Sequence, residues 1–501
     1  MSAEAYPAVP SRGVSGFLGQ AAERGRCGAP RVGRKGCFVE RFVGRKKELH
    51  FLEQYYGKDG CQLVVVYGSR GVGKTRLLSE FCRGKKAFYY LARACSDREQ
   101  RCQWAGELVE RGVEAAGNGG GAASGGQLTG HPEYGELFRA SLLEKETTKQ
   151  VLVIDEFHHI VKAGSDFFES LVNFLDGRLM SRPVMAVLCT SASGWVENHL
   201  VSRLNGLASA IGGFLKLREL KFADIREQYP GYSTEDCIRG YAVLGGMPGY
   251  WTGFSRTLDV RENVVRNLLA KESRLSVEME SFLEQELREP GVYNTILAAM
   301  AGDCSKLDDV YRRTGFSRAK ISVYLKNLME LDLVEKVYSF DTDGRDNARK
   351  GIYRIASPCV RFYFRYLFPN QSRFQLMSPG EFYERYVEPS FDLFAEEAYR
   401  AACREHVCRD YRTAGEWLGK TGILDVVASD GQGNVGVAAC SFSRKMEYRD
   451  YEWLLFSMKK ARLNSSDVRL YCEKGFDDAL RRKAEEGGLK LCRIGDDEEG
   501  C

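Results

Sequence analysis

The chain has 501 residues, of which 44% are hydrophobic and 28% are charged, and its formal net charge at pH 7 is +4. A chain of this length is expected to fold into about three domains, each with its own core. Its apolar stretches stay well short of the roughly 18 residues of a membrane span, and its first residues lack the apolar core of a secretory signal. The 16 cysteines and six histidines complete no zinc pattern. We therefore expect a cytoplasmic protein with reduced thiols and no membrane partner.

The positive charge is concentrated at the start of the chain. Residues 1–36 carry six arginines and lysines against two glutamates, so this segment alone accounts for the net charge of +4. We predict that residues 1–40 form a disordered basic tail, with a transit peptide as the alternative. Because a protein that wraps nucleic acid usually carries a basic surplus, any contact of the remaining chain with nucleic acid has to rest on a local patch.

The most informative motif follows the apolar run 63–67, which we predict to be a strand. Its glycines let the backbone curl so that successive N–H groups face phosphate oxygens, and the helix that follows adds its positive N-terminal end. The motif is a phosphate-binding loop, and its residues are Gly68, Ser69, Arg70, Gly71, Val72, Gly73, Lys74 and Thr75. We expect Lys74 to be a catalytic residue that neutralises the β- and γ-phosphates of ATP, and Thr75 to ligate Mg²⁺.

Two carboxylates follow a second apolar strand at 151–154. In an open α/β sheet the ligand lies beyond the carboxyl ends of the strands, so Asp155 is expected next to the phosphate-binding loop. We expect Asp155 to hold Mg²⁺ together with Thr75 and water, and Glu156 to be the catalytic residue that polarises the attacking water. The pair therefore indicates ATP hydrolysis rather than binding alone.

Alternating strands and helices define the domain around these motifs. Further strands are predicted at 87–91 and at 183–193, which favours a parallel sheet. We assign residues 41–215 to a P-loop ATPase domain that contains a flexible, glycine-rich insertion at about 115–130.

Other polar residues follow the predicted strands. Thr190 or Ser191 is a candidate to sense the γ-phosphate or to position water, and the alternative is a hydroxyl that only satisfies the strand terminus. The adjacent His158 and His159 have no third ligand within reach in the sequence, so we predict structural roles for them.

These motifs, together with Leu-Gly-Gly-Met-Pro-Gly-Tyr at 244–250, resemble the archaeal-type AAA-like ATPases, which are relatives of the STAND signalling ATPases. The resemblance implies an α/β fold, with a parallel-sheet P-loop NTPase core of the ASCE type followed by a helical lid at 216–285. It also implies that Gly246 and Pro248 lie in the lid and contact the nucleotide. A helix-ending turn is the alternative for these two residues.

One departure from the family concerns its arginines. Relatives read Leu-Tyr-Gly-Arg-Arg-Thr after the sensor strand, whereas residues 204–209 read Leu-Asn-Gly-Leu-Ala-Ser. If either arginine stabilises the transition state, its loss slows hydrolysis on the order of 10³-fold. Arg203 is close enough in the sequence to replace it.

The resemblance continues into a winged-helix domain at 286–357. The sequence itself favours helices at 292–301 and 307–313, and a third helix that begins after Ser317 as its N-cap. The apolar face of that third helix consists of Ile321, Leu325 and Leu328. Its outward residues are Arg318, Lys320, Ser322, Lys326 and Asn327.

The third helix is a candidate recognition helix for double-stranded DNA through Arg318, Lys320 and Lys326. A hairpin at 333–354 is expected to form the wing. The basic residues near its tip are Arg345, Arg349 and Lys350. Residues 306–354 carry eleven Lys or Arg against eight Asp or Glu, which is a weak basic footprint. DNA contact and docking of a protein partner therefore both remain open.

Residues 358–501 resemble the family's domain of unknown function, which is related to PD-(D/E)XK nucleases. Such nucleases hold Mg²⁺ with an Asp at the end of one strand and a Glu-x-Lys on the next. Asp425, in the predicted strand 422–428, is the surviving ligand candidate, but Ala439 and Ser441 stand where relatives carry the acid and the lysine. We therefore expect a degenerate nuclease-like fold without nuclease activity.

The motifs predict an ATP-binding P-loop ATPase that acts as a nucleotide-dependent switch, hydrolyses ATP slowly with Mg²⁺ and couples to DNA or to a protein partner through the winged helix. Two alternatives stay open. One is an ATP-dependent DNA-processing nuclease, and the other is a DNA-binding regulator with little ATPase activity.

Overall fold

The computed structural model describes residues 42–111, 132–142, 148–162, 166–176, 183–271, 273, 289–342, 351–419 and 422–495. The predicted basic tail at 1–40, the insertion at 115–130 and the wing-tip residues Arg345, Arg349 and Lys350 lie outside this part of the chain. Within the described ranges, no helix is both long and apolar enough to cross a membrane.

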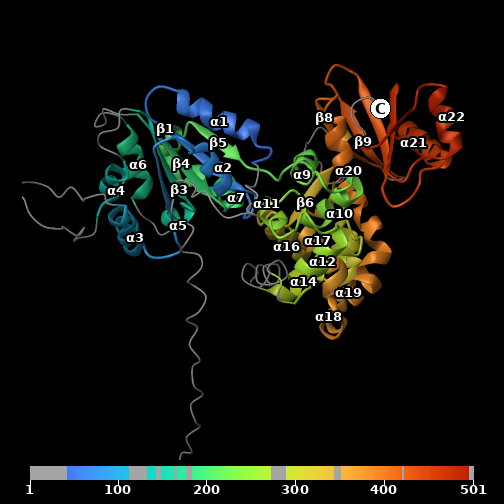
Figure 1. Cartoon of the computed structure of the whole chain (residues 1–501), viewed down its shortest axis with the longest axis horizontal. Helices are drawn as coiled ribbons and strands as arrows, with labels where there is room; N and C mark the ends of the chain where they lie inside the picture. Colours follow the sequence, from blue (N-terminus) through green and yellow to red (C-terminus); the bar gives the residue numbers. More distant parts are fainter. Residues whose placement is uncertain are drawn as a thin grey trace, which may run out of the picture. The chain divides into compact units, whose positions relative to one another are not determined.

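A five-stranded parallel sheet forms the first part of the fold (Figure 1). Its strands are β1 (Gln62–Tyr67), β2 (Ala87–Leu91), β3 (Gln150–Asp155), β4 (Val184–Thr190) and β5 (Gly213–Lys216), in the order β2-β3-β4-β1-β5. All neighbouring pairs are parallel, which confirms the predicted parallel sheet. β3 and β4 are buried along their whole length, as expected for apolar strands that are covered on both faces.

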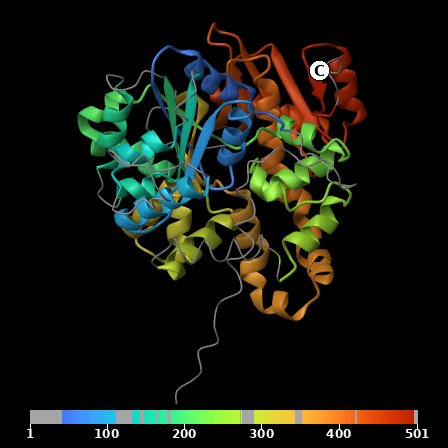
Figure 2. The ribbon, with the colours of Figure 1, turned by 60° about the vertical axis from the view of Figure 1, so that its left-hand side comes forward.

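Helices pack on both faces of this sheet (Figures 1 and 2). They are α1 (Lys46–Gly57), α2 (Lys74–Phe81), α3 (Asp97–Glu110), α4 (Tyr134–Ala140), α5 (His158–Lys162), α6 (Phe167–Leu175), α7 (Ser193–Trp195) and α8 (Val201–Leu204), with short turns η2 (Val196–Leu200) and η3 (Asn205–Ala210). Trp104 of α3 stacks on Tyr90 of β2 with ring centroids 4.1 Å apart. Both side chains are fully buried, so they fix this helix layer to the strands that carry the polar residues described below.

A helical region follows β5. It contains α9 (Phe222–Gln228), α10 (Thr234–Leu244), α11 (Pro248–Trp251) and α12 (Val260–Asn267). The hydroxyl of Ser233 caps α10 by accepting a hydrogen bond from the N–H of Asp236 (3.0 Å). The helix ends at Gly245, whose φ of 61° requires the left-handed backbone that glycine adopts readily.

Three helices and a hairpin come next: α14 (Pro290–Ala301), α15 (Leu307–Thr314), α16 (Arg318–Glu330), and the antiparallel strands β6 (Val334–Tyr338) and β7 (Gly351–Ile355) joined through the turn η4 (Phe340–Thr342). We call these elements the α14–β7 unit. The Ser317 hydroxyl caps α16 by accepting from the N–H of Lys320 (3.3 Å). Ile321, Leu325 and Leu328 are buried. The predicted N-cap and apolar face of this helix are therefore confirmed.

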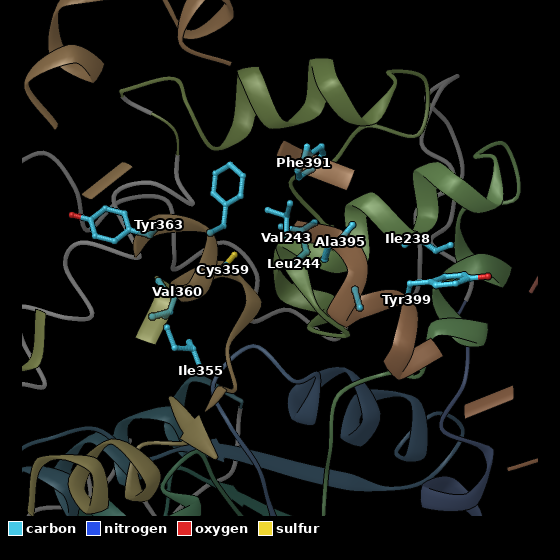
Figure 3. Packing of buried hydrophobic residues seen from close by; sticks show 14 of the residues in the cluster. Ile238, Val243, Leu244, Ile355, Cys359, Val360, Tyr363, Phe391, Ala395 and Tyr399 are labelled. Atoms are coloured by element: carbon cyan, nitrogen blue, oxygen red, sulfur yellow. The ribbon is translucent and has the colours of Figure 1, made fainter. Parts of the chain in front are cut away.

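A helical connection links this unit to the last part of the chain. It contains α17 (Pro358–Phe362), α18 (Gln371–Leu376), α19 (Pro379–Phe382) and α20 (Phe391–Val407), with the turns η6 (Tyr363–Leu367), η7 (Phe368–Asn370), η8 (Tyr383–Val387) and η9 (Glu388–Ser390). Figure 3 shows the shared core, in which Val243 and Leu244 of α10 lie with Cys359 of α17 and Ala395 of α20. α10 and α20 therefore share one core although they lie far apart in the sequence.

The C-terminal part is a mixed five-stranded sheet in the order β12-β11-β10-β9-β8. The strands are β8 (Thr413–Leu418), β9 (Ile423–Ser429), β10 (Val435–Ser441), β11 (Asp467–Cys472) and β12 (Lys490–Cys492), and the helices are α21 (Tyr448–Ala461) and α22 (Asp478–Glu485). β8, β9 and β10 pair antiparallel, whereas β10, β11 and β12 pair parallel. Val426 packs in the core that contains α20, and its neighbour Val427 packs in the core that contains α21, because successive strand residues point to opposite faces.

Candidate nucleotide-binding site

The loop 68–75 connects β1 to α2 at the carboxyl end of the parallel sheet. Gly71 and Gly73 have φ angles of 84° and 96°, which side-chain-bearing residues rarely adopt. Gly68 leaves no room for a side chain, because an added Cβ would lie 2.3 Å from the carbonyl oxygen of Leu217. The loop is therefore closely curled, as a phosphate-binding loop requires.

Lys74 is the first residue of α2 and is only 6% exposed. Its ammonium group donates hydrogen bonds to the carbonyl oxygens of Gly68 (2.7 Å) and Ser69 (3.1 Å). The positive charge thus lies inside the curl of the loop, where it is only weakly screened by solvent. This is the position that the lysine of a phosphate-binding loop is expected to occupy.

Asp155 ends β3 and is 4% exposed. One of its carboxylate oxygens, Oδ2, accepts hydrogen bonds from the hydroxyls of Thr75 (3.3 Å) and Tyr89. The other oxygen accepts from the backbone N–H of Glu156 (2.9 Å). Burial, together with the charge of Asp155, raises the pKa of Tyr89 well above its usual range. The predicted neighbours Thr75 and Asp155 are thus in contact, and Tyr89 is a third member that the sequence does not reveal.

Glu156 is held by the end of the neighbouring strand β4. Its Oε2 accepts hydrogen bonds from the backbone N–H and the hydroxyl of Ser191, both at 2.9 Å, and it lies 3.5 Å from the hydroxyl of Thr190. Nδ1 of His158 lies 3.3 Å from the same oxygen and 2.7 Å from the Thr190 hydroxyl. The structure thus brings both hydroxyl candidates to Glu156, and it adds His158, which the sequence assigned to a structural role.

These contacts set the protonation of Glu156. Burial by itself raises the pKa of this carboxyl, but hydrogen bonds from His158 and Ser191 and the charge of Lys74 outweigh it and lower the pKa to about 2. Glu156 is therefore ionised at all physiological pH values, and it orients polar groups better than it removes protons. Its φ of 52° shows that the backbone is held in a costly conformation to place the side chain here.

The turn after α10 lies on the loop. The N–H of Gly249 donates to the carbonyl oxygen of Gly71 (3.0 Å), and a Cβ added to Gly73 would lie 3.7 Å from Cγ of Pro248. Gly246 is fixed from both sides, since its carbonyl accepts from the N–H of Leu220 (2.8 Å) and an added Cβ would clash with the Leu220 carbonyl oxygen at 1.9 Å. The sequence left two interpretations of Gly246 and Pro248, a helix-ending turn and a nucleotide-contacting part of the lid. They are compatible, because the turn that ends α10 also contacts the loop 68–75.

Two further ionisable residues contact this region, Glu219 at the turn and Arg45 at the loop. The backbone N–H of Gly246 donates to Oε2 of Glu219 (2.8 Å), and burial raises the pKa of Glu219 to about 7. Arg45, which is 9% exposed, donates from its guanidinium to the carbonyl oxygen of Val72 (2.9 Å). The sequence identified neither residue as part of the site. Arg203 lies exposed on α8, and its role as a replacement arginine stays a prediction.

The C-terminal end of α16 also reaches the loop. The hydroxyl of Ser69 donates to Oδ2 of Asp332 (3.1 Å). A Cβ added to Gly194 of α7 would lie 2.7 Å from the carbonyl oxygen of Glu330. Asp332, two residues beyond α16, therefore touches the loop, and Glu330, the last residue of α16, touches the segment that follows β4.

The predicted DNA-contacting residues of α16 are partly occupied by other contacts. Nε of Arg318 lies 2.7 Å from Oδ1 of Asp308, and both side chains are more than half exposed. The ammonium of Lys320 lies 4.8 Å from the ring centroid of Phe316. Lys326 is exposed. Part of the positive charge of this surface is therefore offset by Asp308.

The carboxylates of the C-terminal sheet are paired with arginines. Asp425 accepts from the N–H of Cys440 (2.9 Å) and lies 3.0 Å from Nε of Arg400. Glu416 of β8 lies 2.7 Å from Arg404 of α20. Among the residues that the structure describes, no group of three or more Asp, Glu, His or Cys is placed to hold a metal ion.

Comparisons with known proteins cover the part of the chain that contains the loop 68–75. Residues 42–252 match the model of a family described as an ATPase domain predominantly from Archaea. An uncharacterised protein of Methanocaldococcus jannaschii is 25% identical over 361 residues, which are 71% of this chain and 76% of the relative. An uncharacterised ATP-binding protein of the same organism is 47% identical over 45 residues, 9% of this chain and 76% of the relative. A Walker-type ATPase structure from Pyrococcus abyssi covers 65% of this chain and 96% of its own, with 17% identity and a TM-score of 0.46.

The parallel sheet, the loop 68–75 and the acidic end of β3 define a P-loop ATPase. More particularly, the chain belongs to the archaeal ATPase family whose model matches residues 42–252. This membership implies nucleotide binding.

Proposed function

We propose that this protein is a nucleotide-dependent switch that binds ATP at the loop 68–75, hydrolyses it slowly with Mg²⁺ and thereby controls the contacts of the α14–β7 unit. The observation that carries this proposal is the convergence of four side chains on the carboxyl ends of β1, β3 and β4. These side chains are Lys74, Asp155, Glu156 and Ser191. A triphosphate bound there meets a cation, a metal-binding carboxylate and a water-orienting carboxylate in one place.

Binding of the phosphates rests on Lys74 and the loop. In our proposal the phosphate oxygens replace the carbonyl oxygens of Gly68 and Ser69 as acceptors from the ammonium group. Charge-assisted hydrogen bonds of this kind are about twice as strong as neutral ones. The turn with Gly246 and Pro248 then lies next to the bound nucleotide, which supports a lid role for residues 216–285.

The hydroxyl of Thr75 and the carboxylate of Asp155 fit Mg²⁺, which prefers oxygen ligands and few protein ligands when it is bound with a nucleotide. When bound, Mg²⁺ neutralises charge that develops on the phosphate oxygens. Tyr89 also donates to Asp155, so this residue keeps the carboxylate facing the loop.

Slow hydrolysis follows from two features. Glu156, with its pKa of about 2, orients the attacking water but is a weak proton acceptor. The chain also lacks the paired arginines that relatives carry, since residues 204–209 contain none. An arginine that stabilises the transition state is worth on the order of 10³-fold or more in rate. We propose that slow hydrolysis sets how long the protein stays in its ATP-bound state, and that rapid ATP turnover is not its function.

Coupling to the α14–β7 unit is supported by its contact with the loop. The carboxylate of Asp332 accepts from Ser69, which is close to the position expected for the γ-phosphate in such a loop. A bound triphosphate brings like charge next to Asp332, and this favours release of the end of α16. We propose that the α14–β7 unit is a winged helix within residues 286–357 and that its release exposes it to a partner.

The partner of this unit is either double-stranded DNA, through Arg318, Lys320 and Lys326, or a protein. A DNA-processing nuclease is less well supported, because Asp425 is paired with Arg400 and no second metal ligand stands at Ala439. We therefore propose that residues 358–501 have a nuclease-like fold without nuclease activity.

The proposal is tested by ATP binding and turnover of the wild type and two variants. Lys74→Ala is expected to lose binding, whereas Glu156→Gln is expected to bind ATP without turning it over. If Glu156→Gln hydrolyses ATP as fast as the wild type, the role given to Glu156 is wrong.

A further inference from the structure

Helix α21 has an apolar face that the described residues of the C-terminal part leave exposed. Leu454 and Met458 point into the core against the C-terminal sheet. Trp453 and Phe456 lie on the other face and are 54% and 44% exposed, and Leu455, on the flank of the helix, is 41% exposed. Exposed aromatic side chains gathered on one short helix mark a contact surface more often than isolated apolar residues do.

The aromatic residues form a platform with a cation at each end. The rings of Trp453 and Phe456 are stacked, with centroids 5.4 Å apart and planes 28° from parallel. One stripe of the helix contains both rings and both cations, because successive members are four, three and four residues apart and so lie on the same face. Its residues are Arg449, Trp453, Phe456 and Lys460. The two cations are therefore separated by about 16 Å along the helix axis.

Both cations are accessible although they have partners. The side chain of Arg449 is 69% exposed and lies 3.0 Å from the carboxylate of Glu447. The ammonium of Lys460 lies 5.3 Å from the ring centroid of Phe456. A second lysine, Lys459, is exposed at the same end of the helix. The platform thus carries positive charge at both ends, and the exposed carboxylates of Glu447 and Glu452 lie beside it. Glu447 is the group that a phosphate has to displace from Arg449.

The order of charges along the stripe distinguishes between two occupants. If a second copy of the chain packed α21 against α21 in antiparallel fashion about the aromatic pair, Arg449 would face Lys460 of the other copy. A parallel pairing would set each cation against its own equivalent. Both arrangements place like charges together, which disfavours self-association. A polyanion meets favourable charge at both ends.

We propose that α21 binds single-stranded nucleic acid, with bases stacked on Trp453 and Phe456 and phosphates held by Arg449 and Lys460. Stacking on side chains requires free base faces, which single strands offer and duplexes do not. The combination of aromatic side chains with a basic rim is the arrangement that binds single strands with little sequence preference. This site is separate from the nucleotide-binding loop and does not depend on the function proposed above.

The test uses the full-length protein and an oligothymidylate of about 12 nucleotides, within the usual site size for such binders. Binding is followed by anisotropy of a dye on the oligonucleotide and by tryptophan emission. We expect the wild type to bind with quenching of tryptophan emission, and Trp453→Ala and Phe456→Ala each to weaken binding at least about fivefold. Leu376→Ala is the matched control, because Leu376 is an 87% exposed apolar residue of α18. It is expected to leave binding unchanged.

A second pair of variants keeps the aromatic platform intact. Arg449→Gln and Lys460→Gln are each expected to reduce the slope of log affinity against log salt by about 0.7, the value for one phosphate contact of a single strand. Lys74→Ala is expected to bind the oligonucleotide like the wild type, which separates this site from the ATPase. Equal oligonucleotide affinity of Trp453→Ala and wild type overturns the proposal. The proposal is also overturned if the wild type does not bind the oligonucleotide but self-associates or binds anionic vesicles, and Trp453→Ala abolishes that self-association or vesicle binding.

Discussion

Ser191 donates two hydrogen bonds to a single carboxylate oxygen of Glu156, one from its backbone N–H and one from its hydroxyl, both at 2.9 Å. The contact joins the ends of β4 and β3. It holds the carboxylate in one orientation and, together with His158, keeps its pKa at about 2. Ser191 is therefore a positioning residue in our account, and the orientation of Glu156 is what makes hydrolysis possible.

The hydroxyl of Ser191 should matter for the rate and not for binding. In Ser191→Ala the backbone hydrogen bond remains, so we expect only about 1 kcal/mol of lost positioning and a decrease in kcat of roughly fivefold. The affinity for ATP should stay the same. Steady-state ATP hydrolysis together with calorimetric ATP binding checks both parts. A fivefold loss of ATP affinity at unchanged kcat would show that Ser191 contacts the nucleotide and does not act by positioning Glu156.

Removal of the Lys74 ammonium should weaken ATP binding strongly. The group makes two hydrogen bonds inside the loop, and a hydrogen bond to a charged group contributes about 1.5–3 kcal/mol. Lys74→Ala should therefore lower ATP affinity at least about tenfold in a direct binding titration. Lys490→Ala is the control, since Lys490 pairs with Asp467 in the C-terminal sheet. Near-equal ATP affinity of the two variants would remove Lys74 from the site.

Asp332 should oppose ATP binding. Its carboxylate lies 3.1 Å from the Ser69 hydroxyl, and its repulsion of a bound γ-phosphate is on the order of 1 kcal/mol when solvent screens the two charges as bulk water does. Asp332 has a φ of 56°, and asparagine tolerates this backbone conformation as aspartate does, so Asp332→Asn removes the charge without straining the backbone. We expect it to raise ATP affinity about threefold to tenfold. The control is Asp308→Asn on α15, and an equal effect of both substitutions would indicate a general charge effect.

Glu219 should make stability depend on pH. Burial raises its pKa to about 7 from an ordinary value of 4.5. A carboxyl whose pKa is raised in the folded protein stabilises the fold below its unfolded pKa, and this contribution is lost as the pH rises through 7. Glu219→Gln stays neutral and can still accept from Gly246. The difference in unfolding free energy between Glu219→Gln and the wild type should therefore shift by about 1–3 kcal/mol in favour of the variant when the pH is raised from acidic values to 8.

Thermal or denaturant unfolding of both proteins at several pH values measures this gain. Glu384→Gln, at a largely exposed ion pair with Arg261, is the control and should show little change. A Glu219→Gln curve that runs parallel to that of the wild type would show that Glu219 stays ionised in the fold.

The C-terminal sheet should not cleave DNA. Asp425 is paired with Arg400, so a cation already offsets the charge that a metal ion would need. We expect no cleavage of single-stranded or duplex DNA with Mg²⁺ or Mn²⁺. Arg400→Ala should lose on the order of 1 kcal/mol of stability, because Arg400 is 39% exposed and Asp425 keeps its hydrogen bond from Cys440. Metal-dependent cleavage that disappears in Asp425→Ala would establish a nuclease.

The sequence locates residues whose spacing is dictated by the ligand. Lys74, Thr75 and Asp155 can be predicted as neighbours because a phosphate loop and a strand-end acid have local signatures. Tyr89 was missed, since its contact with Asp155 spans 66 positions and arises only when β2 pairs with β3. Glu219 gave no sequence signal either, because its raised pKa depends on burial.

The same distinction applies to fold and charge partners. The N-cap Ser317 and the apolar face of α16 could be predicted, because capping and helical periodicity act within a few residues. The pairing of Asp425 with Arg400 could not, since α20 and β9 meet only through the tertiary fold. His158 illustrates a third case. Counting metal ligands predicts a structural role for His158, and the fold adds a contact of 3.3 Å with Glu156 that no local pattern indicates.

Amide hydrogen exchange of Glu156→Gln with and without ATP and Mg²⁺ tests the switch most directly. We expect ATP to slow exchange in the loop 68–75. We also expect it to speed exchange around Asp332, from the end of α16 to the start of β6, because the contact of Asp332 with Ser69 is released. Protection of the loop without any change around Asp332 would contradict the switch while leaving nucleotide binding intact.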